Sequence, residues 1–278
     1  MEVVETVRRP FDARLSPAVQ TVEVPCVRRM TADQCAEMVE AFNRHGFVIL
    51  RCRDRTDSRR DLLELKRYFG RSTPHPRADE EGVVAINPFK RVAGFLGSTR
   101  AEHLLHTDGA FRDDPEKIIT LQCVTPAARG GLSVLASGQA AYEHLERRFP
   151  GGIKGLTEPD ALTITRTTQS STQPVFRRDH GTCSIKFRME DGVSEVVPRS
   201  DVRDQFRELC RFFTAPENHL RFRLEAGDVL IGDNCAILHG RTSFAPDERR
   251  DVRRLNFDAS GPLCDRMVFG FRPECHGG

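Results

Sequence analysis

Hydrophobic positions in the first third of the chain alternate between a helical pattern and a short apolar run. Apolar residues recur every three or four positions between Cys35 and Phe42, directly after Thr31 and Gln34, which suit a capping box. This pattern predicts a helix that ends at His45-Gly46, because glycine commonly follows the last turn. Beyond it we expect a buried strand over 47–50, a helix over 57–69, and loops with short strands over 73–89.

From about Leu104 onward, short apolar runs are separated by Gly, Pro and Asp. The runs predict strands at 118–124, 132–135, 162–165, 183–187 and 229–231, with a late strand beginning over 254–258. Two amphipathic stretches interrupt them and predict helices over 138–149 and 200–214. Many short strands with flanking helices favour a mainly β fold with a sandwich or jelly-roll core. Without a visible linker, we expect one domain over 1–278, with an irregular N-terminal arm over 1–30 and a C-terminal tail over 265–278.

Composition narrows the classes of partner and the cellular compartment. The net charge of +2 gives no reason to expect a nucleic-acid or membrane partner. No apolar run is long enough to span a bilayer, and the first residues lack the apolar centre of a secretory signal. Nine cysteines without a C-x-x-C pair indicate free thiols in a reducing compartment. We therefore expect a cytoplasmic protein, monomeric or forming a homo-oligomer, that acts on a small molecule.

His106-Thr107-Asp108 is the first segment that carries chemistry. Side chains two residues apart on an extended strand point to the same side, so His106 and Asp108 can bind one metal ion. A histidine from a distant strand, His239, would complete a set of two imidazoles and one carboxylate, which suits non-haem Fe(II). The alternative for this segment is a surface turn, because His-Thr-Asp-Gly is also good turn chemistry.

The segment around His239 has the turns needed to direct a side chain inward. Gly227-Asp228 precedes the apolar run over 229–231, and Asp233-Asn234 then predicts a second turn before the chain returns to His239. A lone histidine at the end of an apolar strand is more often a satisfied core residue. The flanking turns and the upstream His-x-Asp favour a metal ligand here.

Arginines concentrate in the segment that follows. On a strand, Arg250 and Arg254 share one face, whereas Arg253 lies on the other. A guanidinium suits a carboxylate because it offers two parallel N–H donors. The predicted function is to bind an acidic co-substrate beside the metal. The alternative is a solvated charge run balanced by neighbouring carboxylates: Asp247, Glu248 and Asp251.

Taken together, these motifs resemble the TauD/TfdA-type family, the taurine dioxygenase-like and clavaminate synthase-like Fe(II)/2-oxoglutarate-dependent oxygenases. The resemblance covers roughly residues 30–260. It is carried by motifs in the family's order: His106-Thr107-Asp108, Gly130-Gly131-Leu132-Ser133, Gly227-Asp228, Asp233-Asn234, His239-Gly240-Arg241 and Arg250-Asp251-Val252-Arg253-Arg254.

The resemblance implies a double-stranded β-helix and a role for each matched residue. It implies that His106, Asp108 and His239 bind Fe(II), and that Ser133 and Arg250 hold the far carboxylate of 2-oxoglutarate. Arg254 would support the co-substrate or meet an acidic group of the substrate, and Arg253 is the alternative to Arg250. The implied reaction uses O2 to hydroxylate, or otherwise oxidise, a C–H bond of a small molecule, such as an amino acid or natural-product intermediate, with release of succinate and CO2.

The substrate pocket is less clearly marked in the sequence. Residues 169–174 suggest a polar lid loop, and Lys186 could meet a carboxylate. We expect the lining to come from Asn87, Phe89, His103, Leu105, Phe187, Arg188 and Phe244.

Three other classes of protein stay open at this point. A cupin-like iron enzyme without 2-oxoglutarate would not need Ser133 and Arg250. A catalytically silent binding or regulatory relative would not need all three ligands, and a zinc hydrolase would need a general base that no motif supplies.

Overall fold

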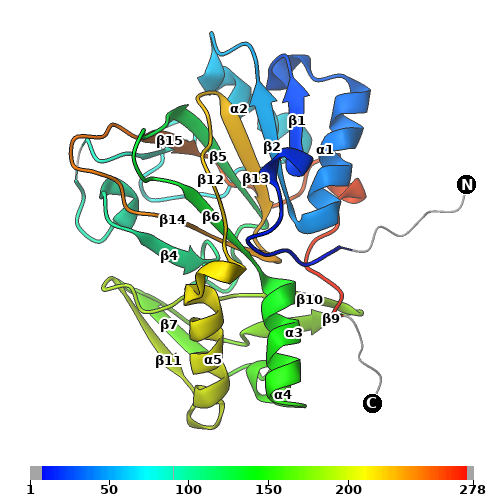
Figure 1. Ribbon diagram of the computed structural model, residues 1–278, viewed down its shortest axis with the longest axis vertical. Helices are drawn as coiled ribbons and strands as arrows, with labels where there is room; N and C mark the ends of the chain where they lie inside the picture. The colour runs from blue at the N-terminus through cyan, green and yellow to red at the C-terminus, as the bar shows by residue number, and fades with distance from the viewer. Residues whose placement is uncertain (1–7, 90, 274–278) are drawn as a thin grey trace, which may run out of the picture.

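The computed structural model describes residues 8–89 and 91–273. Its largest sheet has six strands in the order β1-β2-β13-β5-β15-β3 (Figure 1). All neighbours are antiparallel except β1 and β2. The strands are β1 (Thr21–Val24), β2 (Phe47–Cys52), β13 (Asp228–Asp233), β5 (Ile118–Thr125), β15 (Asp251–Arg254) and β3 (Val84–Ile86).

A four-stranded antiparallel sheet lies against the first one. Its order is β12-β6-β14-β4, formed by β12 (Leu220–Phe222), β6 (Ser133–Ser137), β14 (Ile237–Arg241) and β4 (His103–His106). Strands far apart in the sequence alternate across the two sheets, as in a jelly roll. The predicted mainly β fold with flanking helices is therefore confirmed, together with the strands of the core.

The segment between β6 and β12 forms a separate layer at the lower end in Figure 1. Helices α3 and α5 lie side by side there, next to two small sheets in the orders β11-β7-β8 and β10-β9. The elements are α3 (Gly138–Arg148), α4 (Ile153–Leu156), β7 (Leu162–Arg166), β8 (Gln169–Gln173), β9 (Phe176–Asp179), β10 (Thr182–Ile185), β11 (Ser194–Pro198) and α5 (Arg203–Thr214).

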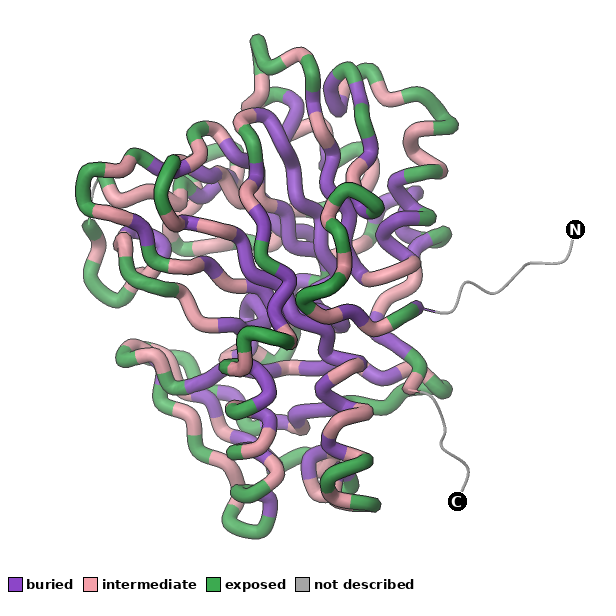
Figure 2. The backbone as a smooth tube through the Cα atoms, in the orientation of Figure 1, coloured by how far each residue is buried: buried purple, intermediate pink, exposed green. Residues whose placement is uncertain are grey.

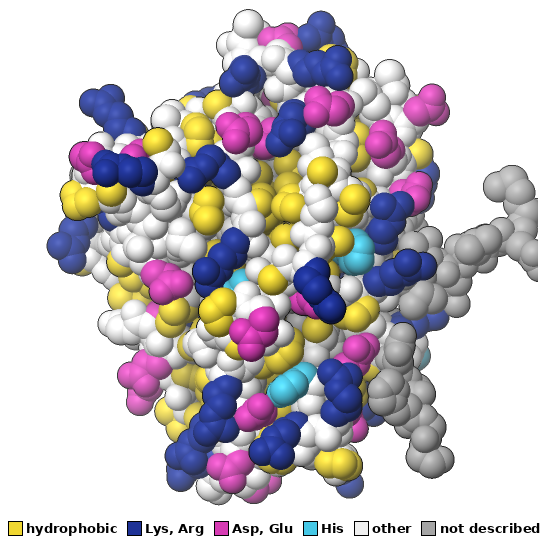
Figure 3. All heavy atoms as spheres, in the orientation of Figure 1, with side chains coloured by type: hydrophobic (Ala, Val, Ile, Leu, Met, Phe, Trp, Pro, Cys, Tyr) yellow, Lys and Arg dark blue, Asp and Glu magenta, His cyan; other side chains and the backbone are white. Residues whose placement is uncertain are grey.

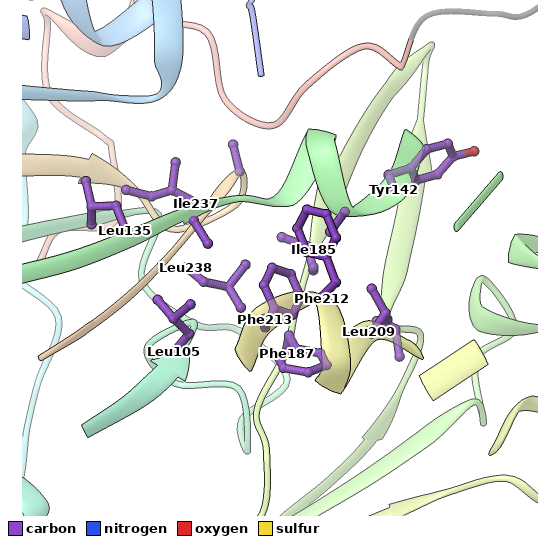
Figure 4. Packing of buried hydrophobic residues seen from close by; sticks show 14 of the residues in the cluster. Leu105, Leu135, Tyr142, Ile185, Phe187, Leu209, Phe212, Phe213, Ile237 and Leu238 are labelled. Atoms are coloured by element: carbon purple, nitrogen blue, oxygen red, sulfur yellow. The ribbon is translucent and has the colours of Figure 1, made fainter. Parts of the chain in front are cut away.

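Strand β2 shows how the core is divided. Phe47 and Ile49 face the inner core between the sheets, whereas Val48 and Leu50 face the helices α1 (Ala32–His45) and α2 (Ser58–Phe69). This alternation follows the two-residue period of a strand that is buried on both sides. The inner core continues into the lower layer, where Phe187 and Phe213 pack against each other (Figure 4). Figure 2 shows the buried segments converging at the junction of the two layers.

The predicted helices are confirmed with small shifts at their ends. Thr31 and Gln34 form the expected capping box of α1, and Gly46 closes the helix with a φ of 84°. The late strand was predicted too far along the chain, because β15 covers Asp251–Arg254. Beyond β15, Phe257 makes isolated bridges to Ser72 and Ile118.

The chain termini are more integrated than predicted. Residues 1–30 were expected as an irregular arm, yet β1 extends the large sheet and Arg8 is buried against Asp233. Phe271, in the expected tail, is buried and pairs with Cys183. The last five residues lie outside the described part of the chain.

Lys and Arg side chains are interspersed with Asp and Glu on the face of the molecule shown in Figure 3. No helix among the described residues is long and apolar enough to cross a membrane.

Candidate metal centre

The candidate residues meet in a cavity between the two sheets. One wall comes from β4, β6 and β14 of the small sheet, and the other comes from β3, β5 and β15 of the large sheet. The segment between β3 and β4, the turn after β4 and the residue before β15 complete the lining. The lining residues are Ile86, Phe95, Gly97, His103, His106, Asp108, Leu121, Ser133, His239, Gly240, Arg241, Arg250, Val252 and Arg254.

His106, Asp108 and His239 form a cluster that could hold a metal ion. His106 is the last residue of β4 and pairs directly with His239 on β14. Asp108 Oδ1 lies 3.4 Å from Nε2 of His106 and 3.9 Å from Nε2 of His239. One ligand atom from each residue lies within 4.8 Å of the others, and all three side chains are buried. Two imidazoles and a carboxylate are the ligand set of non-haem Fe(II) sites.

The protonation of the cluster suits metal binding. Burial lowers the pKa of His106 and lowers that of His239 to about 3, so both rings are neutral near pH 7. His106 Nδ1 lies 2.8 Å from the carbonyl oxygen of Leu104, which can only accept, so its proton sits on Nδ1. That tautomer leaves the lone pair of Nε2 directed at the cluster.

Asp108 is held as a carboxylate by its neighbours. Burial by itself would raise its pKa, but the Arg254 guanidinium, with His239 and His106, holds the pKa well below its usual range. Arg254 Nη1 and Asn256 Nδ2 donate to Oδ2 at 2.9 Å and 2.8 Å. Oδ1 receives no such donor in the described part of the chain and is left open for a ligand.

The backbone of Asp108 is fixed by the Asp233-Asn234 turn. Asn234 Oδ1 accepts from the Asp108 amide at 2.8 Å, and its Nδ2 donates to the Asp108 carbonyl at 2.9 Å. The turn that the sequence placed before His239 therefore also positions the carboxylate ligand.

The Gly130-Gly131 pair allows a close approach of Arg250. A side chain at Gly131 would place its Cβ 2.9 Å from Arg250 Cδ, and one at Gly130 would meet the Ser243 carbonyl oxygen at 2.2 Å. Arg250 Nε donates to the Gly131 carbonyl at 3.1 Å. Ser133, two residues further on, lines the same cavity.

Arg250 is a buried cation that has no ion-pair partner among the described residues. It is 7% exposed, and burial lowers its pKa to about 10, a value at which it is still charged near pH 7. No carboxylate of the described residues forms an ion pair with it. Arg253 lies on the other face of β15, where its Nη1 donates to Ser58 Oγ at 3.2 Å. The geometry thus favours Arg250 over Arg253 as the residue that meets an anion in the cavity.

Of the residues expected to line the substrate pocket, His103 lines the cavity of the metal cluster, whereas the others do not. Leu105 and Phe187 are packed in the inner core, because their side chains point away from the cavity. Asn87 donates to Asp251, and Phe89 is 60% exposed. Arg188 and Phe244 are engaged as well: Arg188 pairs with Asp191, and Phe244 lies under the guanidinium of Arg241.

The expected lid and the lysine are also corrected. Residues 169–173 form β8, an edge strand paired with β7, rather than a loop. Ser171 and Gln173 are buried while their neighbours are exposed, which is the alternation of a half-buried strand. Lys186 Nζ donates to Gln173 Oε1 and to the carbonyls of Arg112 and Asp113, so it has no free N–H for a substrate.

Two neighbours of the cluster were missed in the sequence. Asn256 follows Arg254 by two residues, and the same alternation that placed Arg250 and Arg254 on one face would have included it. Phe95 comes from a loop without a recognisable pattern, so no local signal marks it.

Comparison with known proteins identifies the family of the chain. Residues 9–256 match the taurine catabolism dioxygenase TauD, TfdA family. A uridine-5'-phosphate dioxygenase from Amycolatopsis sp. is 30% identical over 62% of this chain and 66% of its own. An alpha-ketoglutarate-dependent 2,4-dichlorophenoxyacetate dioxygenase from Cupriavidus pinatubonensis is 26% identical over 63% of this chain and 65% of its own. These alignments span just under two thirds of each relative.

The fold comparison extends over more of the chain. The non-heme iron oxygenase OrfP, solved with Fe, succinate and (3S)-hydroxy-L-Arg, superposes with a TM-score of 0.63 at 16% identity. It covers 88% of this chain and 86% of that one, which supports the same jelly-roll fold. The family match covers most of the described residues. The chain belongs to the TauD, TfdA family of Fe(II)- and 2-oxoglutarate-dependent dioxygenases.

Proposed function

We propose that this protein hydroxylates a C–H bond of a small anionic molecule and converts 2-oxoglutarate and O2 to succinate and CO2. Fe(II) would be held by His106, Asp108 and His239, and Ser133 and Arg250 would hold the far carboxylate of 2-oxoglutarate. The observation that carries the proposal is the buried Arg250, which has no ion-pair partner among the described residues and lies in the same cavity as the three-ligand cluster. Iron bound there would supply O2 activation and the oxidation of the C–H bond.

The residues of the chain would bind the metal and 2-oxoglutarate, orient them, and shield the cavity from water. Asp108 would offer Oδ1 to the metal, because Arg254 and Asn256 occupy Oδ2. The guanidinium of Arg250 can bind a carboxylate with two parallel hydrogen bonds, and its burial strengthens that interaction by excluding water. Apolar side chains of the large sheet, Leu121 and Val252, line the same cavity and limit access of water.

An anionic substrate is favoured by two further arginines near the cavity. Arg77 lies over the ring of Phe95, with its Cζ 4.1 Å from the ring centroid, and Phe95 lines the cavity. Arg166 Nη2 donates to the carbonyl of Gly94 at 3.0 Å, beside Phe95. Neither guanidinium is ion-paired in the described part of the chain. The two curated relatives act, by name, on uridine 5'-phosphate and 2,4-dichlorophenoxyacetate, which are both anions.

The first test is an anaerobic titration of the metal-free protein with Fe(II) and then 2-oxoglutarate. We expect the weak visible charge-transfer absorption of the iron chelate in the wild type. Arg250→Leu should weaken 2-oxoglutarate binding by about 100-fold, since it removes a buried charge that faces a carboxylate. Arg253→Leu is the matched control, because Arg253 lies three residues further on, on the other face of β15, and this variant should bind as the wild type does.

Two outcomes would contradict the proposal. Folded, iron-loaded wild-type protein without the absorption would exclude 2-oxoglutarate as the co-substrate. Loss of 2-oxoglutarate binding in Arg253→Leu but not in Arg250→Leu would place the anion site on the other face of β15.

The substrate class is tested by 2-oxoglutarate-dependent succinate release with uridine 5'-phosphate and, as an uncharged control, uridine. Equal stimulation by both compounds would contradict recognition of an anion.

A further inference from the structure

His103 reaches the metal centre through an irregularity of its strand. In a regular strand, residues three positions apart face opposite sides, yet the rings of His103 and His106 stack with centroids 4.2 Å apart. The pairing of β14 with β4 shifts register between His239 and Arg241, and such a bulge redirects a side chain. Gly240 permits this approach, because a Cβ there would lie 2.6 Å from the His103 carbonyl oxygen.

The imidazole of His103 lacks a hydrogen-bond partner. Its Nε2 is shielded from solvent, and neither ring nitrogen has a partner among the described residues. The buried His219, by contrast, has a partner at each ring nitrogen: its Nε2 lies 2.9 Å from the Phe213 carbonyl, and its Nδ1 accepts from Arg221. A shielded, unpaired polar group is unfavourable, so the contrast points to a ligand that His103 meets in the cavity.

The strand register indicates which ligand that is. His106 and His239 form one row across the small sheet, and His103, Arg241 and Ser133 form the next row. Two residues along a strand separate the rows, a distance of about 7 Å, which is close to the length of an extended five-carbon diacid. A molecule that runs from the metal ligands to Ser133 therefore spans the two rows, along the cavity wall to which His103 contributes.

We propose that His103 positions 2-oxoglutarate by donating a hydrogen bond to an oxygen at its metal-proximal end. The inference rests on the proposed function, because it requires 2-oxoglutarate to lie between the metal ligands and Arg250. His103 is a positioning residue here and no metal ligand. The ligand atoms of the cluster come from His106, Asp108 and His239, while the His103 ring stacks behind His106.

The test is calorimetric titration of 2-oxoglutarate into the Mn(II)-loaded protein, which reports binding without turnover. His103→Phe keeps the stacked ring and removes both nitrogens, so we expect 2-oxoglutarate to bind about 10-fold more weakly. Mn(II) affinity and the thermal midpoint of the metal-free protein should stay as in the wild type. His103→Gln restores an amide donor and should recover part of the loss, which a purely structural role would not do.

The possible outcomes separate this inference from the proposed function. Wild-type affinity for 2-oxoglutarate in His103→Phe overturns the role of His103 and leaves the proposed function intact. Weakened Mn(II) binding in the same variant overturns it in favour of a fourth metal ligand. A wild-type protein that binds Mn(II) but no 2-oxoglutarate overturns both.

Discussion

Two buried aspartates, Asp233 in the Asp233-Asn234 turn and Asp108, whose backbone this turn holds, have different roles. Asp233 accepts from the backbone amide of Cys235 with Oδ1, and from Arg8 and the amide of Gly270 with Oδ2. Asp108 accepts from Arg254 and Asn256 with Oδ2 only. One carboxylate is saturated by the protein, and the other keeps an oxygen that faces two imidazoles. The difference distinguishes a structural buried carboxylate from one that can bind a metal.

Size alone would have pointed to another place. A hollow of about 600 Å³ lies between α3 and the β9–β10 hairpin, whereas the cavity of the cluster measures about 50 Å³. The large hollow is lined by side chains such as Glu146 and His180, and His180 is almost fully exposed. The small cavity contains the Asp108 carboxylate and the Arg250 guanidinium, which are buried and only partly satisfied by the described residues. The charged groups therefore identify the site better than the cavity volume does.

The largest expected effect comes from breaking the open carboxylate. Asp108→Asn keeps the size and the acceptor for Asn256 but removes the anionic ligand, so Mn(II) binding should weaken on the order of 1,000-fold. Asp233→Asn is the matched variant, and its folded fraction should bind Mn(II) within about threefold of the wild type. Titration calorimetry at a temperature where both variants are folded measures the two affinities. Equal losses in both variants would remove the distinction between the two carboxylates.

The metal ligands could be predicted from the sequence because their geometry is local. His106 and Asp108 are close because only one residue separates them, although β4 ends at His106 and Asp108 lies in the turn that follows rather than on the predicted strand. The Asp233-Asn234 turn that precedes His239 was also visible in the sequence. The same holds for α1, whose capping box is formed by two residues three positions apart, Thr31 and Gln34. These features depend on short-range backbone geometry, which the sequence expresses directly.

The substrate pocket could not be predicted in the same way. Leu105 is one residue from His106 and points into the core, while His103 enters the cavity only through a bulge in pairing with a strand more than 130 residues away. The polar run over 169–173 suggested a loop, but its alternating burial arises from packing against residues such as Asp113. Contacts of this kind depend on tertiary structure and have no counterpart in a local pattern.

A second prediction concerns stability at the saturated carboxylate. Asp233→Asn leaves the buried guanidinium of Arg8 without its counter-charge, so the free energy of unfolding should fall by about 3 kcal/mol. Denaturant unfolding of the metal-free protein measures this change. Arg29→Leu removes an exposed partner of Asp54 and should cost less than about 1 kcal/mol, which makes it a suitable control. A loss in Asp233→Asn no larger than in this control would show that Arg8 does not need the carboxylate.

The smallest effect is expected at Asn234, which connects the two regions. Its side chain bonds the amide and carbonyl of Asp108 and the carbonyl of Glu116, so Asn234→Ala releases the backbone of the ligand without removing the ligand itself. We expect Mn(II) affinity to fall by about 10-fold, as for other outer contacts of metal sites. Asn234→Asp keeps the acceptor for the Asp108 amide and should retain more affinity. If Asn234→Ala bound Mn(II) as the wild type does, the turn would stabilise the fold without orienting Asp108, and the two carboxylates would be independent.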